Sequence, residues 1–317
     1  MRATQAALER RPARCTVCNG TSTDTVLREN GFEGRACACG TIYVTPEPTP
    51  ADIDAREVLH EDTFYDWPAG LKAQWVRRQT TGRDLLEIGC GTGAFLEAAR
   101  GQGFRVEGIE ADATRAAAAA RRVGTVVRAG YFERIPAERR FDVVYHCDML
   151  AHFDRPGEAL RLMTDFLRPG GVLAFEVGFV ADLPRFWYSW IGEIGYPEHR
   201  WLYSQRSLRR LLHDAGLRID RIKIFDLSAC VTTHHAVRTA ARVLRPVWRR
   251  RRAAAPASTS ESASASAPRE ATREGSPPLL RLQNVLRYRV GAWLPRVGPA
   301  TALVIARPEH GGQDGLR

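Results

Sequence analysis

The segment Leu85-Leu86-Glu87-Ile88-Gly89-Cys90-Gly91-Thr92-Gly93 predicts more about the fold than any other part of the chain. It begins with an apolar run that includes an acidic residue, and three glycines follow at every second position. The apolar part predicts a buried parallel strand, and the glycines allow a tight turn that a ligand can approach closely. Because good helix formers follow at 94–100, we expect a strand–loop–helix nucleotide cradle, with a glycine spacing unlike the dinucleotide fingerprint.

Strand-like and helical segments alternate after this motif. Phe104–Glu110 predicts a second strand that ends in Glu110, 17 residues after Gly93. This distance is close to the one at which an acid meets ribose hydroxyls in nucleotide-binding βαβ units. Further strands are predicted at 125–128, 141–146 and 171–177, with helices at 114–122 and 159–167. The alternation implies a parallel sheet covered on both faces, with ligands at the carboxyl ends of the strands.

Two more strands are predicted towards the C-terminus. Leu217–Leu227 alternates as a strand, and Thr301–Ala306 is a second apolar strand that we expect to return to the sheet and pair with it. The fold class that follows is α/β. We predict a doubly wound, Rossmann-like, mostly parallel sheet with a final antiparallel strand, preceded by a small N-terminal cysteine-paired ribbon.

Changes in composition divide the chain into parts. We expect a ribbon at 1–50, a helical cap at 51–80 broken near 67–70, the nucleotide-binding domain at 81–228 and 279–307, and a tail at 308–317. Within that domain, 178–204 is rich in aromatic residues and follows a strand end, so we expect it to cover the substrate. Residues 229–278 would be a basic helix followed by a disordered linker, because 253–278 holds no aromatic residue.

Four of the seven cysteines lie near the start, as Cys15-x-x-Cys18 and Cys37-x-Cys39. Paired thiolates on two turns close a tetrahedral zinc site in proteins. The second pair is one residue short of the usual spacing, with Ala36 where a cysteine would be expected. We predict a structural Zn²⁺ held by these four cysteines. A ribbon that has lost its metal, and a disulfide or redox role, are the alternatives.

The net charge of +10 invites a nucleic-acid partner, but its distribution weighs against one. From residue 229 onward there are 15 arginines and 5 acidic residues, which accounts for the whole excess and leaves 1–228 neutral. The hydrophobic content of 44% is ample for a core. No segment is long and apolar enough to span a bilayer, and the start lacks the apolar stretch of a secretion signal, so we expect a cytoplasmic protein.

The chain resembles the class I S-adenosylmethionine-dependent methyltransferases, and in particular bacterial tailoring enzymes that carry a cysteine-paired, zinc-ribbon-like segment. Their first motif, acidic-x-Gly-x-Gly-x-Gly, is filled by Glu87, Gly89, Gly91 and Gly93. The segment 197–204 is also similar to the Pro-x-His segment of that family. The resemblance covers residues 15–227 and 279–307.

The resemblance implies a site for S-adenosylmethionine at the strand ends. Its expected residues are Glu87, Gly89, Gly91, Gly93, Glu110, Ala111, Tyr131, Phe132 and His146. In such a site Glu110 binds the ribose hydroxyls and Glu87 orients the loop or meets the amino group through water. Tyr131 and Phe132 would flank the adenine, although Tyr131 stands where the family often has Asp, and Phe132 has ordinary core packing as its alternative. His146 would offer its carbonyl to the ammonium.

Methyl transfer from a sulfonium is an in-line displacement, so the enzyme must align the acceptor and, where needed, remove a proton from it. His199 and His152 are the first candidates for this base, because histidine titrates near neutral pH. Asp148 and Glu176 also lie at predicted strand ends. A turn-fixing role for His152 and a buried anchoring role for His199 are the alternatives. The expected acceptor is a small molecule, such as a sugar, polyketide or quinone-like metabolite.

Three other classes of protein remain open. An RNA methyltransferase would use Arg249–Arg252 for phosphate contacts. A membrane-lipid-associated methyltransferase would lay Val237–Trp248 or Leu279–Trp293 on anionic lipid. A non-catalytic scaffold would bind S-adenosylmethionine without transferring the methyl group. The sequence makes no prediction of the oligomeric state.

Overall fold

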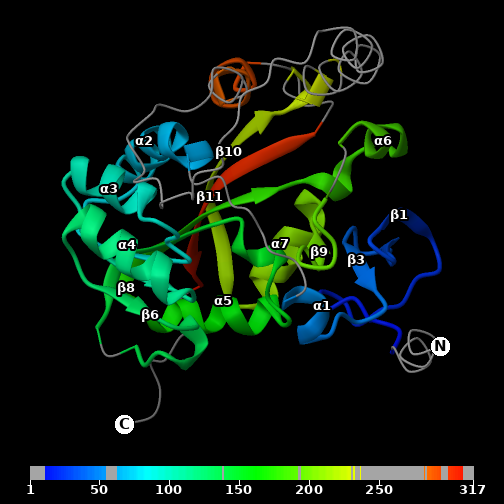
Figure 1. Cartoon of the computed structure of the whole chain (residues 1–317), viewed down its shortest axis with the longest axis horizontal. Helices are drawn as coiled ribbons and strands as arrows, with labels where there is room; N and C mark the ends of the chain where they lie inside the picture. Colours follow the sequence, from blue (N-terminus) through cyan, green and yellow to red (C-terminus); the bar gives the residue numbers. More distant parts are fainter. Residues whose placement is uncertain are drawn as a thin grey trace, which may run out of the picture.

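The structure is a computed structural model that describes residues 11–54, 63–137, 139–191, 194–229, 231–232, 236, 282, 284–293 and 299–309 (Figure 1). The predicted basic helix at 237–252, the predicted disordered linker at 253–278 and the tail beyond 309 lie outside the described residues. None of the helices among the described residues is long and apolar enough to cross a membrane.

Within the described residues, seven strands form the central sheet, in the order β10-β11-β8-β7-β4-β5-β6. Their bounds are β4 (Asp84–Ile88), β5 (Arg105–Glu110), β6 (Val127–Ala129), β7 (Phe141–Cys147), β8 (Leu167–Gly178), β10 (Leu217–Asp226) and β11 (Ala300–Pro308). Strands β6, β5, β4, β7 and β8 run parallel, and β11 pairs antiparallel with both β8 and β10. This confirms the predicted α/β fold with a final antiparallel strand.

Helices cover both faces of this sheet, as the alternation of elements predicts. On one face lie α2 (Thr63–Arg77), α3 (Ala94–Gly101) and α4 (Ala113–Val123), which share a core with Leu85 and Tyr145. On the other face lie α5 (Pro156–Asp165) and α7 (Gln205–Asp214), which share a core with Leu86 and Phe175. Neighbouring residues of one strand thus enter opposite cores, as the pleat of a strand requires.

Helix α2 continues through Pro68, so the predicted break near 67–70 is wrong. Proline inside a helix removes one backbone hydrogen bond, and sequence reasoning treats it as an end signal. Here Ala69, Ala73 and Val76 are buried on the helix face that packs against α3 and the sheet. Tertiary packing of this face outweighs the local cost of the proline.

The N-terminal residues form a second, smaller sheet in the order β1-β2-β3-β9. We call 15–45 the cysteine ribbon; its strands are β1 (Thr25–Glu29), β2 (Phe32–Ala36) and β3 (Ile42–Thr45). The fourth strand, β9 (Trp201–Leu202), comes from the end of the aromatic segment 178–204 and pairs antiparallel with β3. The ribbon lies at the end of the molecule away from α3 and α4 (Figure 1).

Short elements complete the description. They are the α-helices α1 (Pro50–Asp54) and α6 (Tyr188–Ile191), the 3₁₀ turns η2 (Phe132–Arg134), η3 (Met149–Ala151), η4 (Val180–Asp182) and η5 (Arg185–Trp187), and the π-helical turn η6 (Leu286–Val290). In the segment around η6, Asn284 and Tyr288 are buried, whereas Trp293 is 91% exposed. Contact of this segment with lipid stays a prediction.

Candidate functional site

The glycine loop joins β4 to α3 at the carboxyl edge of the sheet. Gly91 and Gly93 adopt left-handed backbone conformations, with φ of 54° and 86°, which favour glycine. A Cβ atom on Gly93 would also lie only 3.1 Å from Val123 and 3.2 Å from Ala119 of α4. The glycines therefore permit both the turn itself and the close approach of α3 to α4.

Glu110, at the end of β5, holds the glycine loop in place. Its Oε2 accepts a hydrogen bond from the amide of Gly91 at 2.8 Å, and its Oε1 accepts one from the amide of Asp112 at 3.2 Å. The side chain is only 7% exposed. Asp112 in turn caps α4 by accepting from the amide of Arg115 at 2.7 Å. The two predicted features, the glycine motif and the acid after it, thus form one connected structure.

Glu87 lies buried in β4 below the loop, and its Oε2 has no hydrogen-bond partner among the described residues. Burial raises the pKa of this carboxyl well above its usual range, although the charge of Lys72 opposes the shift. A buried oxygen without a partner is costly, which marks a position where a donor such as an amino group would be stabilised. The residues present therefore fit the amino-acid portion of S-adenosylmethionine.

The remaining predicted cofactor residues lie in different environments. Tyr131 is 61% exposed, and Ala111 is exposed directly after β5. Phe132 is buried and meets Phe153 edge-on, with ring centroids 5.4 Å apart. The ring of His146 is fully buried and stacks on Phe175, and this burial lowers its pKa to about 3. The His146 side chain is therefore a neutral core group, and the roles predicted for these four residues stay predictions.

Glu176 is the centre of a buried ion cluster near the carboxyl end of β8. It accepts hydrogen bonds from Arg287 at 2.7 Å, Tyr288 at 2.8 Å and Thr301 at 3.1 Å, and it forms an ion pair with Lys72 of α2. Burial alone would raise the pKa of Glu176, but the charges of Lys72 and Arg287 outweigh it and lower this pKa to about 2. A carboxylate so firmly ionised is a poor base near neutral pH, so Glu176 ties α2 and η6 to the sheet instead.

The structure brings His152 and His199 together. Their ring centroids are 4.5 Å apart, although 47 positions separate them in the chain. The Nδ1 atom of His199 has no hydrogen-bond partner among the described residues. Asp148, at the end of β7, interacts electrostatically with His199. Asp148 is exposed at the surface, yet desolvation by the surrounding protein raises its pKa.

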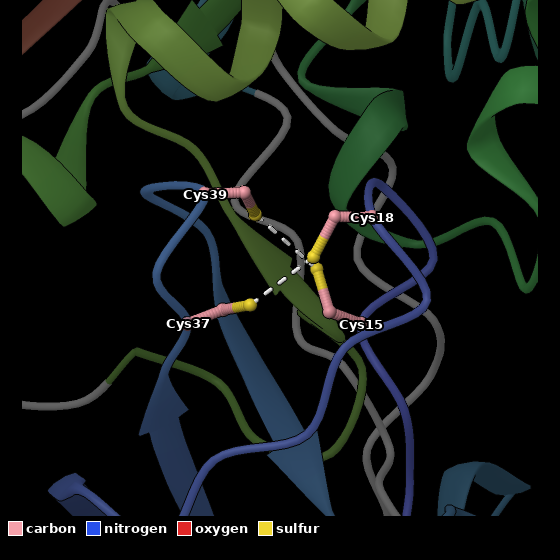
Figure 2. Close-up of side chains that lie close together, drawn as sticks. All are labelled: Cys15, Cys18, Cys37 and Cys39. Atoms are coloured by element: carbon pink, nitrogen blue, oxygen red, sulfur yellow. Dashed lines mark hydrogen bonds between the residues drawn. The ribbon is translucent and has the colours of Figure 1, made fainter.

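The four ribbon cysteines also converge, from two turns on opposite sides of one small space (Figure 2). Their Sγ atoms all lie within 4.8 Å of one another, with Cys15 and Cys39 at 3.6 Å and Cys18 and Cys37 at 3.3 Å. Tetrahedral zinc with Zn–S bonds of about 2.3 Å requires sulfur–sulfur distances of about 3.8 Å. The short Cys-x-Cys spacing is therefore compatible with the donor geometry of a zinc site.

Comparison with known proteins assigns the family. A family model described as "Methyltransferase domain" matches residues 59–222, which is more than half of the chain. The chain belongs to this methyltransferase family. The matched range includes the glycine loop, Glu87, Glu110, His152 and His199.

Two curated relatives are similar to this methyltransferase over part of their length. The dTDP-4-amino-2,3,4,6-tetradeoxy-D-glucose N,N-dimethyltransferase of Saccharopolyspora spinosa is 32% identical over 142 residues, covering 42% of this chain and 57% of the relative. The ubiquinone biosynthesis O-methyltransferase of Caulobacter vibrioides is 37% identical over 119 residues, covering 35% of this chain and 44% of that relative. The chain spans about half the length of the curated relatives it matches.

Among solved structures, the chain is similar to geranyl diphosphate methyltransferase in complex with SAM, with a TM-score of 0.46 and 18% sequence identity. The matched region covers 75% of this chain and 85% of that chain.

Sequence reasoning missed three charged residues of this methyltransferase. Lys72 and Arg287 flank Glu176, and the guanidinium of Arg115 lies over the glycine loop, since a Cβ on Gly91 would come within 2.8 Å of its Nη2. The rarity of lysine, which occurs only twice in the chain, was a sequence signal that could have drawn attention to Lys72. Nothing in the sequence pattern indicates that Arg287 meets Glu176 across 111 positions.

Proposed function

We propose that the chain is an S-adenosylmethionine-dependent methyltransferase that transfers a methyl group to a small-molecule acceptor by in-line displacement. The observation that carries this proposal is the glycine loop held by Glu110 above Glu87, whose buried Oε2 has no partner in the part of the chain that the structure describes. Family membership supports it. The two relatives named above support an acceptor that is a sugar nucleotide or a quinone precursor.

In this proposal each part of the site has its own task. S-adenosylmethionine, when bound, supplies an electrophilic methyl group on a sulfonium. The backbone of the glycine loop and the carboxyl groups of Glu87 and Glu110 bind and orient the cofactor. Residues at the ends of β7 and β8 orient the acceptor, which must be held near attack distance. Where the acceptor atom carries a proton, His199 or His152 removes it from that oxygen or nitrogen.

A transfer assay with methyl-labelled S-adenosylmethionine tests the function directly. The panel should contain aminodeoxysugar nucleotides, polyprenyl catechols and short polyketide phenols. The proposal expects label in at least one of these compounds, with release of S-adenosylhomocysteine in equal amount. Label found only in RNA, with a steep loss of transfer as salt rises, would replace the small-molecule proposal with an RNA methyltransferase.

Replacement of the histidines tests the proposed base. His199→Ala is expected to lower kcat by about 100-fold while S-adenosylmethionine still binds, because a general base contributes at least that factor. His152→Ala is expected to act in the same direction through the shared ring contact. Binding is measured by calorimetry and turnover by release of S-adenosylhomocysteine, and the exposed His213→Ala serves as control. Full turnover in both His199→Ala and His152→Ala would show that neither residue is the base.

We also propose that the ribbon cysteines Cys15, Cys18, Cys37 and Cys39 hold a structural Zn²⁺. Four thiolates would saturate a tetrahedral ion and leave no open position for chemistry. The S···S distances and the burial of three of the four residues support this assignment.

Metal analysis of purified protein tests the zinc proposal. The parent is expected to carry one zinc per chain, and Cys39→Ser to carry little, with a lower melting temperature, because metal binding contributes directly to folding. Cys90→Ser, a buried thiol outside the cluster, is the matched control and should retain the metal. A parent without zinc, whose melting temperature responds neither to added zinc nor to a chelator, would refute the assignment.

A further inference from the structure

The segment 194–203 connects the cysteine ribbon to the central sheet and carries His199. It leads into β9, the strand that extends the sheet of the ribbon by pairing with β3 (Figure 1). Each end of this segment is fastened to a different part of the ribbon, and its middle faces the loop after β7.

The β1–β2 turn of the ribbon fastens the first end. Glu29 accepts hydrogen bonds from the amide of Ile194 at 2.8 Å and from the amide of Gly195 at 3.1 Å. Asn30 donates from its Nδ2 to the carbonyl of Tyr196 at 2.7 Å. Asn30 and Gly31 have φ values of 50° and 80°, the tight hairpin turn that the pair Asn-Gly favours. A rigid turn thus presents two side chains to three consecutive residues.

Gly195, the middle of these three residues, lies against the ring of His199. A Cβ atom on Gly195 would lie 2.6 Å from Nδ1 of His199, so the imidazole packs directly on that glycine. The amide of His199 also donates to the carbonyl of Gly195 at 3.2 Å. The peptide that Glu29 holds is therefore the same peptide against which the imidazole rests.

The second end is fastened by β3 and then reaches the loop that carries His152. The amide of Val44 donates to the carbonyl of Arg200 at 3.0 Å, and β9 continues the pairing with β3. The amide of Arg200 donates to the carbonyl of Ala151 at 2.7 Å, and Nε1 of Trp201 donates to the carbonyl of Phe153 at 2.7 Å. The two carbonyls flank His152 in the chain. The segment that carries His199 therefore also holds the loop that carries His152.

We infer that the cysteine ribbon positions the acceptor-side histidine pair, with Glu29 and Asn30 as the positioning residues that fix His199 from the β1–β2 turn. The importance of this for turnover rests on the proposed function. The position of the His199 ring is independent of the proposed function, because the contacts that fix it lie within the protein. The ribbon thereby has a task in the methyltransferase domain other than binding metal.

Three variants and one control separate positioning from a general loss of structure. Glu29→Ala removes both carboxylate oxygens, whereas Glu29→Gln keeps one oxygen acceptor. Asn30→Gly removes the side-chain amide, and glycine still tolerates the left-handed backbone of the turn. Glu33→Ala is the matched control, because this carboxylate of the same hairpin bonds to Thr25, Arg28 and Arg35 within the ribbon. Zinc content and melting temperature are recorded for each protein.

Ring signals of selectively labelled histidine provide the primary readout. The eight histidines are few enough to resolve, and His199→Ala assigns the signal of interest. Glu29→Ala and Asn30→Gly are expected to shift or broaden the His199 signal and to leave exposed His213 unchanged. Turnover should fall about 10- to 100-fold at unchanged affinity for S-adenosylmethionine, because misplaced groups lose alignment. Glu29→Gln should show smaller changes than Glu29→Ala, both in the His199 signal and in turnover.

The inference is wrong if both folded variants give the His199 signal of the parent, or if Glu33→Ala moves that signal as much as they do. A shifted signal with parental turnover would equally overturn the link between ribbon and catalysis. If the parent itself neither binds S-adenosylmethionine nor transfers a methyl group, the proposed function fails, and the ring signals still decide whether the ribbon positions His199.

Discussion

Glu110→Ala is expected to weaken the binding of S-adenosylmethionine by about 100-fold or more. The substitution removes the carboxylate that accepts from the amides of Gly91 and Asp112. Hydrogen bonds to a charged group contribute about 1.5–3 kcal/mol each, and every 1.4 kcal/mol is a tenfold change in affinity. The proposed bonds to the ribose hydroxyls are lost in the same step, so the glycine loop and the cofactor both lose their anchor.

Two further variants make this result specific. Glu110→Gln keeps the size of the side chain and one acceptor oxygen, so its affinity should lie between those of the parent and the alanine variant. Glu133→Ala removes an exposed acid from the neighbouring turn η2 and should bind as the parent does. Affinity is measured by calorimetry at fixed salt. Parental affinity in a folded Glu110→Ala protein would contradict the proposed cofactor site.

Glu176→Ala is expected to lower the free energy of unfolding by about 3–5 kcal/mol, which is a large part of the stability of a domain. The substitution removes the common partner of two cations, buried Lys72 and partly buried Arg287. It also removes the acceptor for the hydroxyl of Tyr288, and leaves the carbonyl of Val177 as the acceptor for the hydroxyl of Thr301. Denaturant unfolding measures the loss, and Glu158→Ala, which removes an exposed ion pair, should cost less than about 1 kcal/mol.

The pH dependence of stability gives an independent check on Glu176. Its pKa is lowered from 4.5 to about 2 in the folded protein, so the folded state favours the ionised form. The contribution to stability is therefore complete above about pH 4.5 and disappears as the pH falls towards 2. The parent should lose stability over this window more steeply than Glu176→Ala does. Parallel stability curves for the two proteins would show that folding does not lower the pKa of Glu176.

Much of the nucleotide-binding half of the fold was predictable, because local patterns specify it. The run from Leu85 to Gly93 combines strand, turn and helix signals in one short stretch, and Glu110 follows at a characteristic distance. The antiparallel pairing of β11 with β10 was predictable for the same reason, since both strands are long and strongly apolar or alternating. The structure places the rings of His199 and His152 in contact, and their predicted role as a base stays a prediction.

The rest depends on contacts between distant residues that carry no local signal. Strand β9 has only two residues, too few to show a periodicity, and its pairing of Trp201 with Tyr43 follows from tertiary placement. The bond between Glu29 and Ile194 spans 165 positions, and no local sequence pattern indicates it. Helix α2 continues through Pro68 because its buried face packs on α3, which local propensity does not include.

Titration of S-adenosylmethionine into the parent and Glu110→Ala proteins by calorimetry is the most informative single measurement. The glycine loop, Glu87 and Glu110 predict one site per chain that binds the parent tightly and the variant at least about 100-fold more weakly. The absence of any binding heat in the parent over a range of temperatures, or equal affinities in the two proteins, would contradict a cofactor site at this edge of the sheet.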